Sequence, residues 1–219
     1  MDFEIAKKIS RELKTNLERV AREYWEMVLL KEISQSKIGN FLIFAGGTAL
    51  RLAYGSPRFS DDLDFYLKKK FSFSTFKSEI QKIAKKYNIE ITDLYNKFFT
   101  FLAEFKIKED FLPLPFRIKI EIRKKILKKG FESRLLSSPT VNFQVLLFVL
   151  SLEKIKELKI KALKERKEPR DLFDLWFISQ KLKIPFEKPK IKIEKKILKQ
   201  NLLKYLPSDY KKVVEELIK

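Results

Sequence analysis

The sequence predicts an α+β fold, in which helices flank a mixed β-sheet core and a helical bundle forms the C-terminal part. Three observations lead to this prediction. Residues 3–34 contain neither proline nor glycine and have a helical pattern, extended stretches recur up to residue 150, and only helical patterns follow Ser151. We therefore expect an α/β core with N-terminal helices over residues 1–150 and a helical domain over residues 151–219.

The first part of the chain reads as helix, strand, helix, loop and strand. A break in the first helical stretch is expected near Leu13–Thr15. A short apolar strand then ends at two glycines, a short helix opens directly after them, and glycine, serine and proline mark the next loop. The expected elements are the helix at 3–34, the strand Phe41–Ala45, the helix Thr48–Tyr54, the loop Gly55–Ser60 and the strand Leu63–Leu67.

The middle of the chain holds one more helix and then extended stretches. The amphipathic segment Ser74–Asn88 predicts a helix with Ser74 as its N-cap. In Phe116–Lys125, charged residues alternate with isoleucines, which is the pattern of a strand that has one polar and one buried face. The expected strands are Ile89–Tyr95, Phe98–Ile107, Phe116–Lys125 and Gln144–Leu150.

After Ser151 the pattern is helical to the end. Ser151 is a plausible cap for the helix Leu152–Arg166, and Pro169 is suited to the first turn of a second helix that continues to Leu182. A loop containing Pro185 and Pro189 follows. Two further helices are expected near residues 192–205 and 209–218.

Composition narrows the chemistry. The formal charge of +19 is compatible with a lysine-rich surface kept for solubility, as in a thermophile-like protein, or with a polyanionic partner such as RNA. The chain has no cysteine and no histidine, which excludes disulfides, thiol nucleophiles, Ser-His triads and Cys/His zinc sites. Any metal must bind to oxygen ligands, which favours Mg²⁺, with Mn²⁺ as an alternative.

Nothing in the sequence indicates a membrane location. The N-terminal residues MDFEIAKKISRELK are charged throughout, and no secretion signal is expected there. The apolar run Val145–Leu150 is too short to span a bilayer. We expect a cytoplasmic protein without a membrane partner.

A glycine turn followed by paired acids is the most informative stretch. A strand that runs into Gly46 and Gly47 and then into a helix presents free backbone N–H groups to an anion, and the Thr48 hydroxyl could add a donor. Asp62 and Asp64 are two residues apart on a strand, so their side chains share one face. Two adjacent carboxylates repel each other unless a cation lies between them, which predicts a divalent metal site rather than a solvated turn.

A third carboxylate would complete a site for phosphoryl transfer. Glu121 lies on the predicted strand Phe116–Lys125, on the face that also carries Arg117 and Arg123. It could be a metal ligand, or it could form a cross-strand salt bridge with one of these arginines. The sequence leaves both interpretations open.

Two motifs carry a resemblance to a known family. The pattern GGTALRL…RFSDDLDF resembles the signature of the nucleotidyltransferase superfamily, and more narrowly the AbiEii/AbiGii abortive-infection toxins, which include the MenA-like toxins. A second signature of that branch, Lys-x-x-Ala-Leu followed by Arg…Arg-Asp-x-x-Asp, is similar to KIKALKERKEPRDLFDL in this chain. The resemblance covers roughly residues 35–180 and implies a nucleotidyltransferase-type core. The matching residues are Lys159, Ala162, Leu163, Arg166, Arg170, Asp171 and Asp174.

The second motif also has a physical interpretation. Lys159 and Arg166 are seven residues apart and share a helix face, and with Arg170 they form a positive patch suited to a triphosphate. Asp171 and Asp174 lie in the first turn of the next helix, where acids are favoured, and Asp174 could simply form an i,i+4 pair with Arg170. The resemblance associates Asp171 with catalysis, either by orienting Lys159 or by assisting proton removal.

The resemblance implies a Mg²⁺-dependent nucleotidyltransferase toxin that is held in check by an antitoxin. The triphosphate of an NTP would rest on the glycine turn, with Arg58 and Ser60 as further contacts. The acceptor that the family implies is the 3′ end of tRNA. Two alternatives remain: transfer to a protein or small molecule, and a non-catalytic module that binds nucleic acid or antitoxin.

Overall fold

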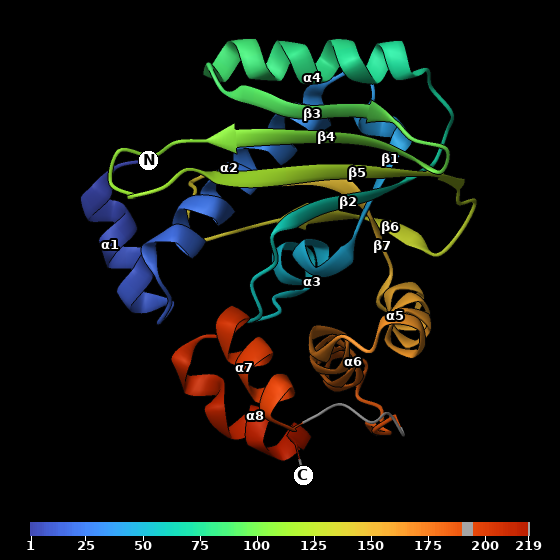
Figure 1. Ribbon diagram of the computed structural model, residues 1–219. Helices are drawn as coiled ribbons and strands as arrows, with labels where there is room; N and C mark the ends of the chain where they lie inside the picture. The colour runs from blue at the N-terminus through green and yellow to red at the C-terminus, as the bar shows by residue number, and fades with distance from the viewer. Residues whose placement is uncertain (190–194, 219) are drawn as a thin grey trace.

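The computed structural model describes residues 1–189 and 195–218, and its centre is one mixed β-sheet (Figure 1). The strand order is β3-β4-β5-β2-β1-β7-β6. The pairs β1–β7 and β2–β5 are parallel and the other neighbours are antiparallel, which confirms the predicted α+β class. The strands are β1 (Leu42–Ala45), β2 (Asp62–Leu67), β3 (Glu90–Asn96), β4 (Thr100–Ile107), β5 (Phe116–Ile126), β6 (Phe131–Leu136) and β7 (Val145–Leu150).

Helices surround the sheet at the positions that the sequence predicts. The first helical stretch is broken as expected, and the Asn16 side chain caps the second part by accepting a hydrogen bond of 2.9 Å from the Arg19 N–H. The helices are α1 (Phe3–Glu12), α2 (Leu17–Gln35), η1 (Gly39–Phe41), α3 (Gly46–Tyr54), α4 (Phe73–Tyr87), α5 (Leu152–Arg166), α6 (Pro169–Leu182), α7 (Lys195–Tyr205), η2 (Ser208–Tyr210) and α8 (Lys211–Ile218).

The sheet has one apolar face and one polar face around the middle strands. On β5, Ile118, Ile120 and Ile122 are fully buried, as their alternation predicts. Phe101 of β4 packs against Phe76 of α4 with a ring distance of 5.7 Å, so α4 covers this apolar face. Helices α5 to α8 lie beyond the opposite face (Figure 1).

The C-terminal helices share the core of the sheet. Apolar side chains of β7, α5, α6, α7 and α8 belong to the same buried cluster as those of β1 and β2. Pairwise contacts link α5 to α6, α6 to α7 and α7 to α8, which gives the predicted C-terminal bundle. The boundary predicted at residue 150 falls between β7 and α5, and the independence of the two parts stays a prediction.

Several features differ from the sequence-based expectations or fall outside them. Helix α3 begins at Gly46 rather than Thr48, and β4 begins at Thr100 rather than Phe98. The predicted cap Ser74 is wrong, because the Ser72 hydroxyl accepts the Thr75 N–H and α4 begins at Phe73. Strand β6 was not predicted, because the edge-strand sequence FESRLL places three polar residues in a row and does not alternate regularly. Residues 192–194 of the predicted seventh helix lie outside the described residues. Among the described helices, none is long and apolar enough to cross a membrane.

Candidate active site

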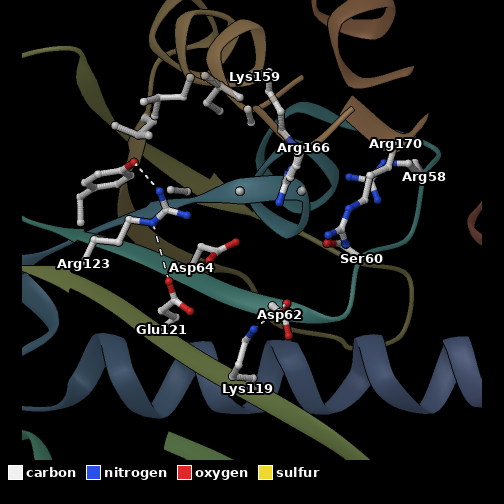
Figure 2. Close-up of a pocket in the computed structure, with 18 of the residues that line it drawn as sticks. Arg58, Ser60, Asp62, Asp64, Lys119, Glu121, Arg123, Lys159, Arg166 and Arg170 are labelled. Atoms are coloured by element: carbon white, nitrogen blue, oxygen red, sulfur yellow. Dashed lines mark hydrogen bonds and ion pairs between the residues drawn. The ribbon is translucent and has the colours of Figure 1, made fainter. Parts of the chain in front are cut away.

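The paired acids Asp62 and Asp64 open strand β2 on its polar face. Leu63 and Phe65, which alternate with them, are fully buried in the core, so the two carboxylates share the other face as predicted. Both line a cavity of about 400 Å³ between the sheet and helix α5 (Figure 2). The two adjacent carboxylates are therefore directed into the same cavity.

The glycine turn forms the wall of the cavity next to these acids. Gly46 has a φ of +80°, and a Cβ atom at this position would overlap the Asp64 carboxylate. A Cβ atom on Gly47 would lie 2.6 Å from the Ser60 Oγ. Helix α3 starts here without a side-chain cap at Ala45, which leaves the backbone N–H groups of its first turn available to an anion.

Contrary to the sequence-based expectation, the Thr48 hydroxyl does not point its donor at the cavity. The hydroxyl is buried and donates a hydrogen bond of 2.6 Å to the Asp62 carbonyl oxygen. This bond ties the first turn of α3 to the beginning of β2. This hydrogen bond joins two residues that are 14 positions apart in the chain, and it fixes the glycine turn next to the paired acids.

Asp62 has a cationic partner that the sequence did not single out. The Lys119 Nζ lies 3.2 Å from the Asp62 Oδ2, across the parallel pair β2–β5. Burial lowers the pKa of Lys119, but the negative charges of Asp62 and Glu121 outweigh it and raise the pKa. The alternation of β5 places Lys119 on the same face as Glu121, and that was the available signal.

Asp64 lacks comparable neutralisation. Burial and the negative charge of Asp62 raise its pKa, and Glu121 adds to this because it is the register partner of Asp64 on β5. Glu121 itself lies 3.9 Å from the Arg123 Nε, so the predicted pairing with one arginine is present, but within β5 rather than across strands. Within residues 1–189 and 195–218, no compact group of three metal-binding side chains is formed.

These acids are nevertheless a suitable donor set for a hard divalent cation. Asp62 and Asp64 offer carboxylate oxygens on one face, and Glu121 is the next acid across the sheet. The raised pKa of Asp64 means that Arg123 and Lys159 only partly compensate its negative charge against burial and Asp62, and a bound cation would supply the remainder. The three acids predicted from the sequence as metal ligands thus line one cavity.

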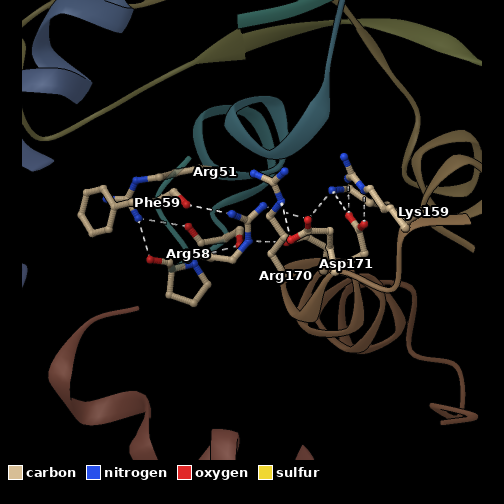
Figure 3. A network of polar contacts seen from close by, with 11 residues as sticks. Arg51, Arg58, Phe59, Lys159, Arg170 and Asp171 are labelled. Atoms are coloured by element: carbon tan, nitrogen blue, oxygen red, sulfur yellow. Dashed lines mark hydrogen bonds and ion pairs between the residues drawn. The ribbon is translucent and has the colours of Figure 1, made fainter. Parts of the chain in front are cut away.

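The opposite wall of the cavity is built from the second sequence motif. Lys159 of α5 donates a hydrogen bond of 2.8 Å to the Asp171 Oδ1 of α6. Arg166 donates two further bonds, of 2.7 and 2.9 Å, to the same carboxylate (Figure 3). The predicted common face of Lys159 and Arg166 therefore converges on Asp171, which is fully buried.

The expected pair between Arg170 and Asp174 is wrong. Asp174 is fully buried and accepts two hydrogen bonds from Arg58, at 2.7 and 2.8 Å, and it also forms an ion pair with Lys159. Arg170 lies on the cavity side instead, with its Nε 3.9 Å from Glu168. The reason is tertiary, because Asp174 faces inward toward α5 and the loop before β2.

Arg58 and Arg170 differ in what they can offer a ligand. The Arg58 guanidinium is buried and engaged by Asp174 and by the Phe59 carbonyl oxygen at 2.9 Å. The Nε of Arg170 is buried and has no hydrogen-bond partner within the described residues. Arg58 therefore holds α6 against the glycine turn, whereas Arg170 retains donor capacity at the cavity.

The buried acids of this network are held ionised. Burial alone would raise the pKa of Asp174, but Arg58 and Lys159 more than offset it and lower the pKa to about 2. For Asp171, burial is likewise outweighed by Lys159 and Arg166, and the pKa is lowered. Both carboxylates act as fixed negative anchors for cationic side chains.

The cavity as a whole has separate regions for a cation and for an anion. Acids and Lys119 lie on the sheet side, and the basic side chains of α5 and α6 lie opposite, with the glycine turn between them (Figure 2). A metal-bound polyphosphate has this combination of charges. Beyond the predicted residues, the lining also includes Tyr66, Lys119 and Arg123.

Comparison with known proteins gives one family and a similar fold. Residues 28–217 match the family described as the AbiEii toxin, a nucleotidyl transferase of type IV toxin–antitoxin systems. An uncharacterized protein of Aquifex aeolicus (strain VF5) is 30% identical over 156 residues, which cover 69% of this chain and 64% of that protein. The chain thus spans about two thirds of the length of this relative.

Two solved structures from Helicobacter pylori share the fold. JHP933 aligns with a TM-score of 0.55 and 20% identity, covering 74% of this chain and 66% of that one. A candidate nucleotidyltransferase aligns with a TM-score of 0.51 and 21% identity, covering 72% of this chain and 67% of that one.

Proposed function

This chain belongs to the AbiEii nucleotidyl transferase toxin family, and on that premise we propose that it transfers a nucleotide from an NTP to an acceptor hydroxyl with release of pyrophosphate. One observation carries the proposal. A single cavity joins the acids Asp62 and Asp64, the free amides of the glycine turn and the basic wall around Lys159.

The proposed cofactor is Mg²⁺, with Mn²⁺ as an alternative. Asp62 and Asp64 would hold it, and Glu121 would be a third ligand directly or through water. When bound, the ion would neutralise phosphate oxygens and lower the pKa of the acceptor hydroxyl. Lys119 shares Asp62, so part of its role is to balance the charge of this carboxylate.

The triphosphate would be held between the glycine turn and the basic wall. The backbone N–H groups of Gly46, Gly47 and Thr48 and the Ser60 hydroxyl would donate hydrogen bonds to it from one side. Arg166 and Arg170 would contact it from the other side. Arg58 would contribute indirectly by fixing the loop beside Gly47.

Lys159 is the proposed charge-stabilising residue. It would neutralise negative charge that builds on the phosphates during transfer. Asp171 is fully buried and its oxygens already accept three hydrogen bonds from Lys159 and Arg166. It therefore serves better as a positioning residue for Lys159 than as a base that removes a proton.

The proposed acceptor is the 3′ end of an RNA such as tRNA, and the proposed setting is a cytoplasmic toxin–antitoxin pair. The formal charge of +19 supports a polyanionic acceptor. Membership of a type IV toxin–antitoxin family implies an antitoxin partner.

The test is a labelling reaction. The purified chain is incubated with Mg²⁺, total tRNA and each of the four NTPs labelled at the α-phosphate. Label at the 3′ end of RNA is expected, and it should be lost in Asp62→Asn and Asp64→Asn and retained in Asp110→Asn, which changes an exposed acid of the β4–β5 loop. Label on polypeptide or on a small molecule would show that RNA is not the acceptor. Undiminished labelling by both active-site variants would refute the enzymatic proposal.

A further inference from the structure

The turn between β3 and β4 presents aromatic side chains to solvent. Tyr95, Phe98 and Phe99 are 53%, 86% and 75% exposed. The rings of Phe98 and Phe99 pack edge to face against each other, with centroids 4.5 Å apart. Large aromatic side chains gain little from such exposure, so this cluster, which we call the aromatic hairpin, needs a reason outside the packing of the fold.

The aromatic hairpin is held in a defined shape. The Lys124 Nζ of β5 donates to the Asn96 Oδ1 at 2.8 Å, to the Phe98 carbonyl oxygen at 3.3 Å and to the Lys97 carbonyl oxygen. The same ammonium group lies 4.9 Å from the Phe101 ring centroid. The hydrogen bonds from Lys124 thus fix the conformation of the turn, which lowers the entropic cost of binding a ligand to its exposed rings.

The hairpin is connected to the candidate active site by the register of the sheet. Tyr95 pairs with Leu102, Leu102 with Glu121, and Glu121 with Asp64, so one cross-strand row runs from β3 to β2. Residues paired in this way project to the same face. Three strand spacings of roughly 4.8 Å place Tyr95 about 14 Å from Asp64.

The surroundings of the hairpin are basic. Lys97 at its tip is exposed. At the same end of the sheet, Lys125 near the end of β5 and Lys128 and Lys129 after it are also exposed. Arg123, in the row next to that of Glu121, is half-exposed and lines the cavity. Positive side chains interspersed with exposed aromatic rings are the arrangement that binds single-stranded nucleic acid without strict sequence preference.

We propose that the aromatic hairpin is a base-stacking platform for the acceptor strand, a single-stranded RNA 3′ end that crosses β3, β4 and β5 to place its terminal hydroxyl at Asp64. Tyr95 and Phe98 stack on unpaired bases a few nucleotides from the terminus, and Lys97 and Arg123 contact the backbone phosphates. This inference rests on the proposed nucleotidyl transfer to an RNA 3′ end and adds the surface that would hold the acceptor strand.

The first experiment measures affinity rather than activity. Fluorescence anisotropy of a short labelled single-stranded RNA with a free 3′ hydroxyl is compared between the full chain and the double variants F98L/F99L and F98Y/F99Y. Leucine keeps the apolar surface but removes stacking, so the Kd should rise at least about tenfold, whereas tyrosine should retain the affinity. Leu114→Ala, at the opposite end of the same strands and 75% exposed, is the control and should not change the Kd.

Two further measurements separate this inference from the proposed reaction. Binding of a non-hydrolysable NTP with Mg²⁺, read as a thermal shift, should be unchanged in F98L/F99L, and Asp62→Asn should bind the RNA normally while losing transfer. Lys97→Gln should reduce the slope of log K against log salt by about 0.7. An RNA affinity that is unaffected by F98L/F99L would overturn the platform and point to a protein partner, even if transfer by the parent chain is confirmed.

Discussion

The Arg58 guanidinium makes two hydrogen bonds to the Asp174 carboxylate, across 116 residues of the chain and out of contact with solvent. Arg58 precedes the paired acids of β2, and Asp174 lies in the helix that anchors Lys159. The pair therefore joins the acidic and basic walls of the cavity.

Removing either partner of this pair should destabilise the protein strongly. Asp174→Ala leaves Arg58 as an uncompensated buried charge, and the free energy of unfolding should fall by about 3–5 kcal/mol. Urea unfolding of Arg58→Met, Asp174→Leu and the variant with both changes measures the interaction energy between the two side chains. The double variant should be more stable than either single one, and strictly additive losses would contradict a direct pairing.

The Asp174 carboxylate should also make the stability of the protein depend on pH in the acidic range. The pKa of Asp174 is about 2 in the folded protein, below its ordinary value of 3.8, so its contribution is fully present above about pH 4 and is lost as the pH falls toward 2. The loss should be on the order of 2 kcal/mol. Urea unfolding at several pH values between 2 and 5 gives the free energy of unfolding as a function of pH. This free energy should change less steeply with pH in Asp174→Asn than in the parent chain, and equal pH dependence would contradict the low pKa.

Two glycines with positive φ offer a matched comparison. Gly46→Ala introduces strain at φ +80° and a clash with the Asp64 carboxylate, whereas Gly55→Ala has φ +76° but nothing nearer than the Lys181 Nζ at 3.9 Å. Both should lose about 1–3 kcal/mol of stability from strain. Titration with Mg²⁺ and a non-hydrolysable NTP should show weakened binding for Gly46→Ala alone. Equal binding by the two variants would show that the glycine turn does not contact the nucleotide or the ion.

Lys119 should compete with a divalent cation for Asp62. Replacing it with glutamine removes a positive charge 3.2 Å from the carboxylate, so the Kd for Mg²⁺ should fall about two- to fivefold, as for an interaction of up to ~1 kcal/mol at a half-exposed site. Calorimetric titration with Mg²⁺ alone measures this. The control is Lys106→Gln, which removes a partner of Glu90 on the edge of the sheet. Weaker binding in Lys119→Gln would show that Lys119 supports the ion instead.

Local periodicity explains what could be predicted from the sequence. The shared face of Asp62 and Asp64 follows from the two-residue repeat of a strand, and the convergence of Lys159 and Arg166 follows from helical spacing. Strand β6 escaped prediction because its residues alternate weakly at a sheet edge, and the cap of α4 was misplaced by two residues because Ser74, which was predicted as the cap, lies inside the first turn that Ser72 caps.

Partners brought together by the fold could not be predicted in this way. The bond from Arg58 to Asp174 and the ion pair from Lys119 to Asp62 depend on how separate elements pack and pair. For Asp174 an alternative partner, Arg170, was nearer in the sequence and was wrong. The arginines considered for the sheet acids were neighbours of Glu121 alone, and Arg123 does lie 3.9 Å from it. Proximity along the chain was therefore a poor guide for the buried Asp174, but not for the partly exposed Glu121.

The bridge from Arg58 to Asp174 also bears on how such a chain can change over generations. Because one partner precedes the sheet acids and the other lies in α6, C-terminal helices taken from a relative without an acid at the position of Asp174 would leave Arg58 as an unpaired buried charge. Recombination between residues 58 and 174 should therefore yield working hybrids only where the incoming segment carries that acid.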